Sequence, residues 1–128
     1  MSQLRASLKA RLARRDFVIG IAPKFPSTDL VAALAPRFDY VFLDCENAGP
    51  DVETIPDLVR AAHAGGAAAL VRPWSKERGL LRRYLGCGID GFIMPDVESA
   101  DEVASVRALM ADVRPDDAAS LIYLALLE

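Results

Sequence analysis

Charged and amide side chains follow several short apolar segments that are expected to be strands. They are Asp44, Glu46 and Asn47 at and after the end of the segment 40–44, Arg72 after 68–71, Asp96 and Glu98 beyond Pro95 after 91–94, and Glu128 after 121–127. In parallel α/β folds, functional groups collect at the carboxyl ends of the strands, where the loops converge on one face. Several strands therefore direct charged groups to a single candidate site.

Carboxylates together with one arginine suit an oxygen-ligated divalent metal and an anionic substrate. The guanidinium of Arg72 is suited to bidentate recognition of a carboxylate or an enolate. Structural roles are the alternatives: Asp44 or Glu46 would also suit a helix cap or a lysine pair, and Arg72 a structural salt bridge. Asp96 and Glu98 are expected at the surface, ahead of a helix.

Other common site chemistries find no support in the sequence. The glycines at 65–66 and 86–88 fit neither a dinucleotide-binding fingerprint nor a P-loop, and neither a serine nucleophile elbow nor an HExxH motif occurs. His63 is expected late in a helix, facing solvent or the helix C-terminus, without a catalytic role. Cys45 and Cys87 lack metal or redox spacing and are interpreted as two buried thiols.

Hydrophobic periodicity and turn residues predict the elements that position these groups. Leu4, Leu8 and Leu12 share one face of an N-terminal helix, with basic residues on the other face. Strands are expected at 17–22, 40–44, 68–71, 91–94 and 121–127, and helices at 27–35, 54–64, 75–85 and 99–110. Ser27, Ser75 and Ser99 are the expected caps, the last within a capping box that includes Glu102. Apolar strands alternating with helices predict an α/β fold with a parallel sheet, either open and doubly wound or part of a closed barrel.

Composition limits the classes of partner. The chain has 128 residues, of which 52% are apolar and 26% charged, and its net charge is −3. One domain with a substantial core is expected, and a nucleic-acid partner is not. No apolar run is long enough to span a membrane, and the N-terminus lacks the apolar stretch of a secretory signal, so a cytoplasmic location is predicted.

Three segments resemble the HpcH/HpaI aldolase and citrate lyase family. They are FDYVFLDCENAGP at 38–50, LVRP at 70–73 and GFIMPDVES at 91–99, and they occur in the family's order. The resemblance covers essentially the whole chain. It implies a (β/α)₈ barrel of which residues 1–128 supply an N-terminal helix and about five β/α units, as one partial domain truncated after the fifth strand.

The resemblance also implies a carbon–carbon lyase that releases pyruvate from a 2-oxo acid, using Mg²⁺, Mn²⁺ or Co²⁺. Glu128 matches a metal ligand, and Arg72 matches the arginine that hydrogen-bonds the keto or enolate oxygen. Asp44 matches the acid that orients a catalytic base. Glu46 matches an acidic position near the metal's water molecules, and Pro95 a position beside the substrate.

Two departures from the family pattern affect the expected activity. The aldolases have a histidine as general base where this chain has Asn47, whose amide cannot accept a proton near neutral pH. The citrate and acyl-thioester lyases do not rely on that histidine, so the asparagine is compatible with a different substrate. A full barrel takes about 250 residues, and the family's second metal carboxylate would come on the next strand.

Two hypotheses from different classes follow. The first is a metal-dependent lyase acting on a small carboxylate, with little activity expected from the isolated chain. The second is a non-catalytic half-barrel that acts as a binding or assembly module. Two uncovered sheet edges would favour a homo-oligomer or a complementary half-barrel as partner.

Overall fold

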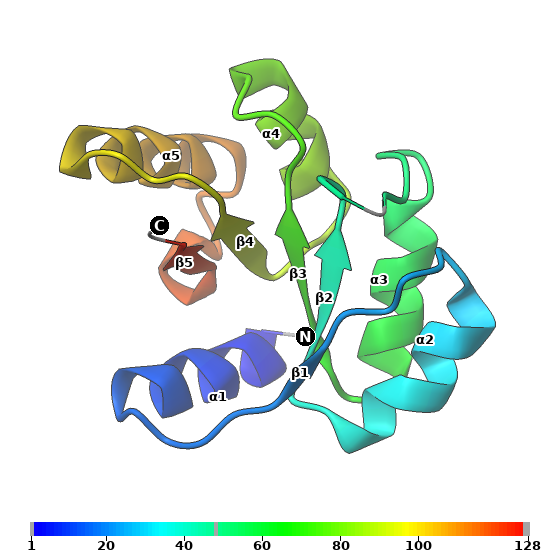
Figure 1. Ribbon diagram of the computed structural model, residues 1–128. Coiled ribbons are helices and arrows are strands. Elements are labelled where there is room, and N and C mark those ends of the chain that lie inside the picture. The colour runs from blue at the N-terminus through cyan, green and yellow to red at the C-terminus, as the bar shows by residue number, and fades with distance from the viewer. Residues whose placement is uncertain (1, 48, 127–128) are drawn as a thin grey trace.

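Five parallel strands form one sheet whose spatial order follows the chain, β1-β2-β3-β4-β5 (Figure 1). The computed structural model describes residues 2–47 and 49–126. The strands are β1 (Gly20–Ile21), β2 (Tyr40–Asp44), β3 (Ala68–Arg72), β4 (Gly91–Met94) and β5 (Ile122–Ala125). Each neighbouring pair is parallel, so the carboxyl ends of all five strands lie at the same end of the sheet. The predicted parallel α/β fold is confirmed.

Helices connect the strands and follow most of the predicted boundaries. They are α1 (Ser2–Ala13), α2 (Thr28–Leu34), α3 (Ile55–Ala64), α4 (Arg78–Gly86) and α5 (Ala100–Val113), with 3₁₀ turns η1 (Ala35–Arg37) and η2 (Ala118–Ser120). The hydroxyl of Ser27 accepts a hydrogen bond from the Leu30 N–H, and that of Ser99 accepts one from Glu102. Two of the three predicted serine caps are therefore confirmed, because each hydroxyl satisfies an N–H that has no partner within its helix.

The cap of α4 differs from the prediction. Glu77, not Ser75, is its N-cap, and the Glu77 carboxylate accepts hydrogen bonds from the N–H groups of Gly79 and Leu80. These bonds lower the pKa of Glu77. Ser75 instead accepts a hydrogen bond from the Glu77 N–H at 3.1 Å, so it closes the turn that precedes the helix.

The two faces of the sheet belong to different apolar clusters, because successive strand residues point to opposite faces. Helices α2 to α5 cover the outer face (Figure 1). The outer cluster includes Val41, Leu43, Ala69, Val71, Phe92 and Met94. On the inner face Ala68, Leu70, Ile93 and Ile122 pack with Leu8 of α1. Residues that share the inner face with Leu70 are therefore placed where a barrel would enclose them.

Helix α1 lies across the amino ends of the strands (Figure 1). Leu8 and Leu12 of the predicted leucine face pack with the inner-face residues. Two basic residues of α1, Lys9 and Arg11, contact other parts of the fold. Lys9 donates to the backbone oxygens of Ala119 and Leu121, at 2.7 and 2.9 Å. Arg11 forms an ion pair with Asp39. These contacts attach the helix to the segments that precede β5 and β2.

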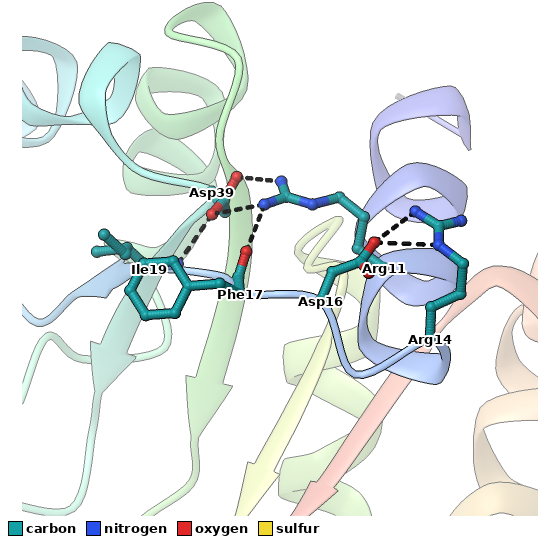
Figure 2. A network of polar contacts seen from close by, with 6 residues as sticks. All are labelled: Arg11, Arg14, Asp16, Phe17, Ile19 and Asp39. Carbon is teal, nitrogen blue, oxygen red and sulfur yellow. Dashed lines mark hydrogen bonds and ion pairs between the residues drawn. The ribbon is translucent and has the colours of Figure 1, made fainter.

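The first strand is shorter than the predicted 17–22. Asp39 binds the Ile19 N–H through its carboxylate at 2.8 Å, and Arg11 donates to the Phe17 oxygen at 2.7 Å (Figure 2). The Ile19 N–H and the Phe17 oxygen are therefore bonded by side chains and not by the backbone of a neighbouring strand. The regular pairing of β1 with β2 begins only at Gly20. The Phe17 side chain is 81% exposed, so the apolar pattern there does not mark a buried strand.

His63 also departs from its prediction. Its Nε2 lies 2.7 Å from an oxygen of Asp90, which is fully buried and accepts a further hydrogen bond from the Ala69 N–H. The imidazole therefore contacts the interior at the amino end of β3 instead of facing solvent. Cys45 is buried as predicted, whereas Cys87 is only partly buried. No helix within the described ranges has the length and apolar character needed to cross a bilayer.

Candidate functional site

The carboxyl ends of β2 and β3 bring Asp44 and Arg72 together. The two residues are register partners and are the last residues of their strands. Each lies two positions after an inner-face residue, Phe42 and Leu70 respectively. The alternation of a strand therefore places both side chains on the inner face at one end of the sheet.

Asp44 and Arg72 form a two-pronged ion pair. The Arg72 Nε donates to Asp44 Oδ1 at 2.9 Å, and Nη2 donates to Oδ2 at 2.6 Å. Glu46 places a second carboxylate 3.1 Å from the same Nε. Among the residues that the structure describes, none accepts a hydrogen bond from Arg72 Nη1. The structural salt bridge considered as an alternative for Arg72 thus exists, and it fixes the guanidinium by one edge.

Asp44 also builds the turn that follows β2. Its Oδ1 accepts hydrogen bonds from the N–H groups of Glu46 and Asn47, at 3.1 and 3.2 Å. An aspartate that binds backbone N–H groups two and three residues ahead holds the chain in a tight turn. Glu46 and Asn47 are exposed at this turn. One buried carboxylate therefore positions the arginine and the two polar residues predicted beside it.

The charges at these strand ends stabilise one another. The hydrogen bonds from Arg72, followed by those from the turn N–H groups, lower the pKa of Asp44 although its burial acts in the opposite direction. The bond to Asp44 raises the pKa of Arg72. The guanidinium also lies 5.3 Å from the centre of the Phe42 ring, within the range of a cation–π contact. Arg72 is therefore a permanently charged donor that is held by Asp44, Glu46 and the Phe42 ring and remains 19% exposed.

The remaining predicted site residues lie at neighbouring positions or outside the described residues. Pro95 follows β4 directly and is buried, and Asp96 and Glu98 are exposed, as predicted. Glu128 lies outside the described residues. The structure thus brings together Asp44, Glu46 and Arg72, with Asn47 in the adjoining turn.

The described residues do not form a metal site by themselves. No group of three or more histidine, cysteine, aspartate or glutamate side chains within 2–47 and 49–126 could hold a metal ion. Asp44 and Glu46 both face the cation Arg72, which competes with any metal for their oxygens. The metal prediction consequently still depends on Glu128.

A cavity of about 590 Å³ opens beside Glu46. Trp74, Arg83 and Tyr84 are among the residues that line it. Its volume is typical of small-molecule pockets, which range from about 300 to 1,000 Å³. Cys45 lines it too, but burial raises the pKa of that thiol to about 11, so the thiol stays protonated and unreactive near neutral pH.

Sequence reasoning did not single out Lys76. Its ammonium group donates to the backbone oxygen of Asp96 at 2.5 Å and pairs with Glu102 at 2.6 Å, which joins the loops after β3 and β4. The only indication in the sequence was that Lys76 lies four residues after Arg72. Nothing in a single sequence distinguishes it from a solvated surface lysine.

Comparisons with known proteins support the same assignment as the motifs. The model of the HpcH/HpaI aldolase/citrate lyase family matches residues 27–120. A 5-keto-4-deoxy-D-glucarate aldolase of Salmonella paratyphi A is 36% identical over 102 residues, covering 78% of this chain and 40% of that protein. The chain therefore spans about 40% of the length of the curated relatives that it matches.

Solved structures share the fold. An HpcH/HpaI aldolase from Desulfitobacterium hafniense superposes with a TM-score of 0.73 at 26% identity, covering 92% of this chain and 55% of that one. A family protein from Burkholderia cenocepacia gives a TM-score of 0.82 at 22% identity, covering 94% of this chain and 58% of that one. The predicted partial (β/α)₈ barrel is confirmed by these likenesses. The family match and the fold agree with the motifs at 38–50, 70–73 and 91–99, and the chain belongs to the HpcH/HpaI aldolase/citrate lyase family.

Proposed function

We propose that the protein acts as a carbon–carbon lyase on a 2-oxo acid or a related carboxylate, with Arg72 binding the keto or enolate oxygen of the substrate. The observation that carries this proposal is the geometry of the guanidinium. Asp44 and Glu46 hold one edge of it at the carboxyl end of β3, and Nη1 donates to no residue in the described part of the chain. A cation fixed in this way is a donor available to an anionic ligand.

The chemistry assigned to Arg72 follows from where charge develops. When the C3–C4 bond of a 4-hydroxy-2-oxo acid breaks, its electron pair stays on C3 and is delocalised onto the 2-oxo oxygen, which gives the enolate of pyruvate. C4 becomes the aldehyde carbon as the 4-hydroxyl group loses its proton to a base. A donor held in place before the reaction binds this oxyanion more strongly than it binds the neutral keto oxygen, which lowers the barrier. Asp44 contributes by fixing the donor. Its predicted role in orienting a base remains a prediction.

A divalent ion remains part of the proposal, as Mg²⁺, Mn²⁺ or Co²⁺. It rests on Glu128 and on membership of the family, whereas the described residues do not fit such an ion on their own. No step assigned here to Arg72 or Asp44 depends on it. We also propose a cytoplasmic location and no direct role in binding nucleic acid or membranes.

The substrate class has two candidates within the family. Cleavage of a 4-hydroxy-2-oxo acid or a 2-oxo-3-deoxy acid to pyruvate and an aldehyde is supported by the 5-keto-4-deoxy-D-glucarate aldolase among the relatives. This reaction requires a base for the hydroxyl proton, and Asn47 cannot supply one near neutral pH. Cleavage of a citrate-like or acyl-thioester substrate is supported by the family's second activity and by that asparagine.

Substitution Asn47→His separates the two candidates. Asn47 is exposed, and only its backbone N–H is held by Asp44, so a histidine is accommodated without burial. If the protein is an aldolase that has lost its base, pyruvate release from a 4-hydroxy-2-oxo acid should rise at least about tenfold. A coupled assay with lactate dehydrogenase measures it, with Asn47→Gln as the matched control. An unchanged rate would contradict the aldolase assignment and favour the citrate or acyl-thioester lyase.

We also propose that the sheet edges are covered by a second copy or by a complementary half-barrel. Apolar side chains are exposed beside both edge strands: Phe17 and Ile19 before β1, and Leu126 after β5. Uncovered strand edges favour association. Light scattering on the purified chain should give at least twice the 13.8 kDa of one copy. A stable monomer at tens of micromolar would contradict self-association and leave a complementary half-barrel as the partner.

A further inference from the structure

The cavity beside Glu46 adjoins the candidate site. It lies between the loop after β2, residues 45–53, and helix α4, and Trp74 forms part of its wall. Glu46 belongs to both places, because it lines the cavity and its carboxylate lies 3.1 Å from the Arg72 Nε. Trp74 follows Arg72 by two residues. A ligand that is held by Arg72 and is longer than pyruvate therefore extends past Glu46 into the cavity.

One thiol links the two walls of the cavity. The Sγ atom of Cys87, at the end of α4, lies 3.6 Å from the Val52 oxygen in the loop and 3.2 Å from the Arg83 oxygen in the helix, both within hydrogen-bonding range of sulfur. Cys45 and Tyr84 are buried and form a largely apolar part of the lining. This packing holds the Arg83 backbone opposite the loop after β2.

Arg83 is the only cation among the described residues that line the cavity. Its side chain is exposed, and within 2–47 and 49–126 no residue accepts a hydrogen bond from its guanidinium. Its neighbour Arg82 instead pairs with Asp112 at 2.7 Å, away from the cavity. A guanidinium whose donors are available to a ligand is suited to binding a carboxylate.

The other lining residues restrict what the cavity can hold. The indole of Trp74 is 66% exposed and offers an apolar surface to a carbon chain. Ligand cavities combine such apolar walls with a few polar groups that fix the orientation of the ligand. Asp51 and Glu53 also line the cavity, and they repel a carboxylate at any position away from Arg83. A ligand carboxylate would consequently bind on the α4 side.

We propose that this cavity is the subsite for the part of the substrate beyond the breaking bond, where Arg83 binds a terminal carboxylate and Trp74 contacts the carbon chain. The inference rests on the proposed function and assigns to it two specificity-determining residues. A 2-oxo diacid and a citrate-like acid both carry a carboxylate that could occupy this position. An ion pair at an exposed site is worth up to about fivefold in affinity. Arg83 therefore selects among acids whose other end is held by Arg72.

Three acids that the protein cannot cleave test the subsite, because none has a 4-hydroxyl group. 2-Oxoadipate and 2-oxohexanoate are equally long and end in a carboxylate and a methyl group respectively, and pyruvate ends before the cavity. Isothermal titration calorimetry with Mg²⁺ should show about fivefold tighter binding of 2-oxoadipate than of 2-oxohexanoate. Arg83→Met should abolish this preference without changing pyruvate binding, and Arg83→Lys should retain it. Arg82→Met, which removes the same charge from the same helix, should also leave the preference intact.

Two further variants test the walls of the cavity. Trp74→Ala should weaken both six-carbon acids about fivefold and leave pyruvate binding unchanged, which a loss of folding would not do. Glu53→Gln should strengthen 2-oxoadipate about twofold and leave 2-oxohexanoate unchanged, because only the former has a terminal charge to be repelled.

The outcome for pyruvate separates this inference from the proposed function. If pyruvate binds but the unaltered chain does not prefer 2-oxoadipate, or Arg83→Met keeps the preference, the subsite is wrong and the proposed function stands. If pyruvate does not bind the unaltered chain, the proposed function is wrong, and the subsite that depends on it is wrong as well.

Discussion

Replacement of Arg72 by alanine is expected to weaken pyruvate binding at least about thirtyfold, because truncating one partner of a buried, hydrogen-bonded charge pair costs about 2 kcal/mol or more. The conservative variant Arg72→Lys should weaken binding about tenfold. A lysine retains the charge but cannot bind Asp44 in a fork and donate to the substrate at the same time. Isothermal titration calorimetry with pyruvate in the presence of Mg²⁺ measures both effects.

The matched control for this prediction is Arg82→Ala. Arg82 is an exposed arginine of α4 that pairs with Asp112 at 2.7 Å on the outside of the sheet. Its removal changes the net charge by the same amount as Arg72→Ala without altering the strand ends. Equal weakening by both alanine variants would show that pyruvate responds to overall charge, and the assignment of Arg72 would then be wrong.

Substitution Asp44→Asn is expected to lower the free energy of unfolding by about 2–3 kcal/mol, measured by urea denaturation. The variant keeps an oxygen that can accept the two turn N–H groups but removes the negative charge that compensates the largely buried Arg72. Asp44→Ala should cost about 1 kcal/mol more, because the turn N–H groups then also lose their acceptor. The difference between the two variants isolates the contribution of the turn.

The pH dependence of stability provides a second test of the Asp44–Arg72 pair. The pKa of Asp44 in the folded chain lies below its ordinary value of 3.8, chiefly because of the bonds from Arg72. The stability that this pair contributes should therefore be complete above about pH 4 and be lost as the pH falls through the lowered pKa. The unaltered chain and Asp44→Asn should accordingly converge in stability below pH 4. A difference that stays constant through this range would contradict the assignment.

The part of the site that the sequence predicts follows from short-range rules. Asp44 and Arg72 each close a five-residue strand, and strand alternation with parallel pairing is enough to place them side by side. The serine caps of α2 and α5 follow equally local rules, since each serine bonds an N–H three residues ahead. The family motifs contain these same residues, so resemblance and local pattern agree.

The features that the sequence did not predict depend on contacts between distant residues. Arg11 and Asp39 shorten the first strand although 28 positions separate them, and His63 meets Asp90 across 27 positions. Lys76 reaches Asp96 from a loop 20 residues earlier. The neighbouring residues in the sequence would be equally consistent with each of these polar side chains lying exposed to solvent. Only the packing of one β/α unit against the next determines its partner.

The most direct test of the central claim is an NMR titration of the chain, in the presence of Mg²⁺, with pyruvate and with lactate as the matched ligand that lacks the keto oxygen. If Arg72 binds the keto oxygen, pyruvate should shift the Arg72 Nε–H signal saturably, together with the Glu46 and Asn47 amides that share Asp44, and lactate should bind more weakly. The absence of a saturable shift, or equal responses to pyruvate and lactate, would contradict the claim that the carboxyl ends of β2 and β3 recognise a 2-oxo acid.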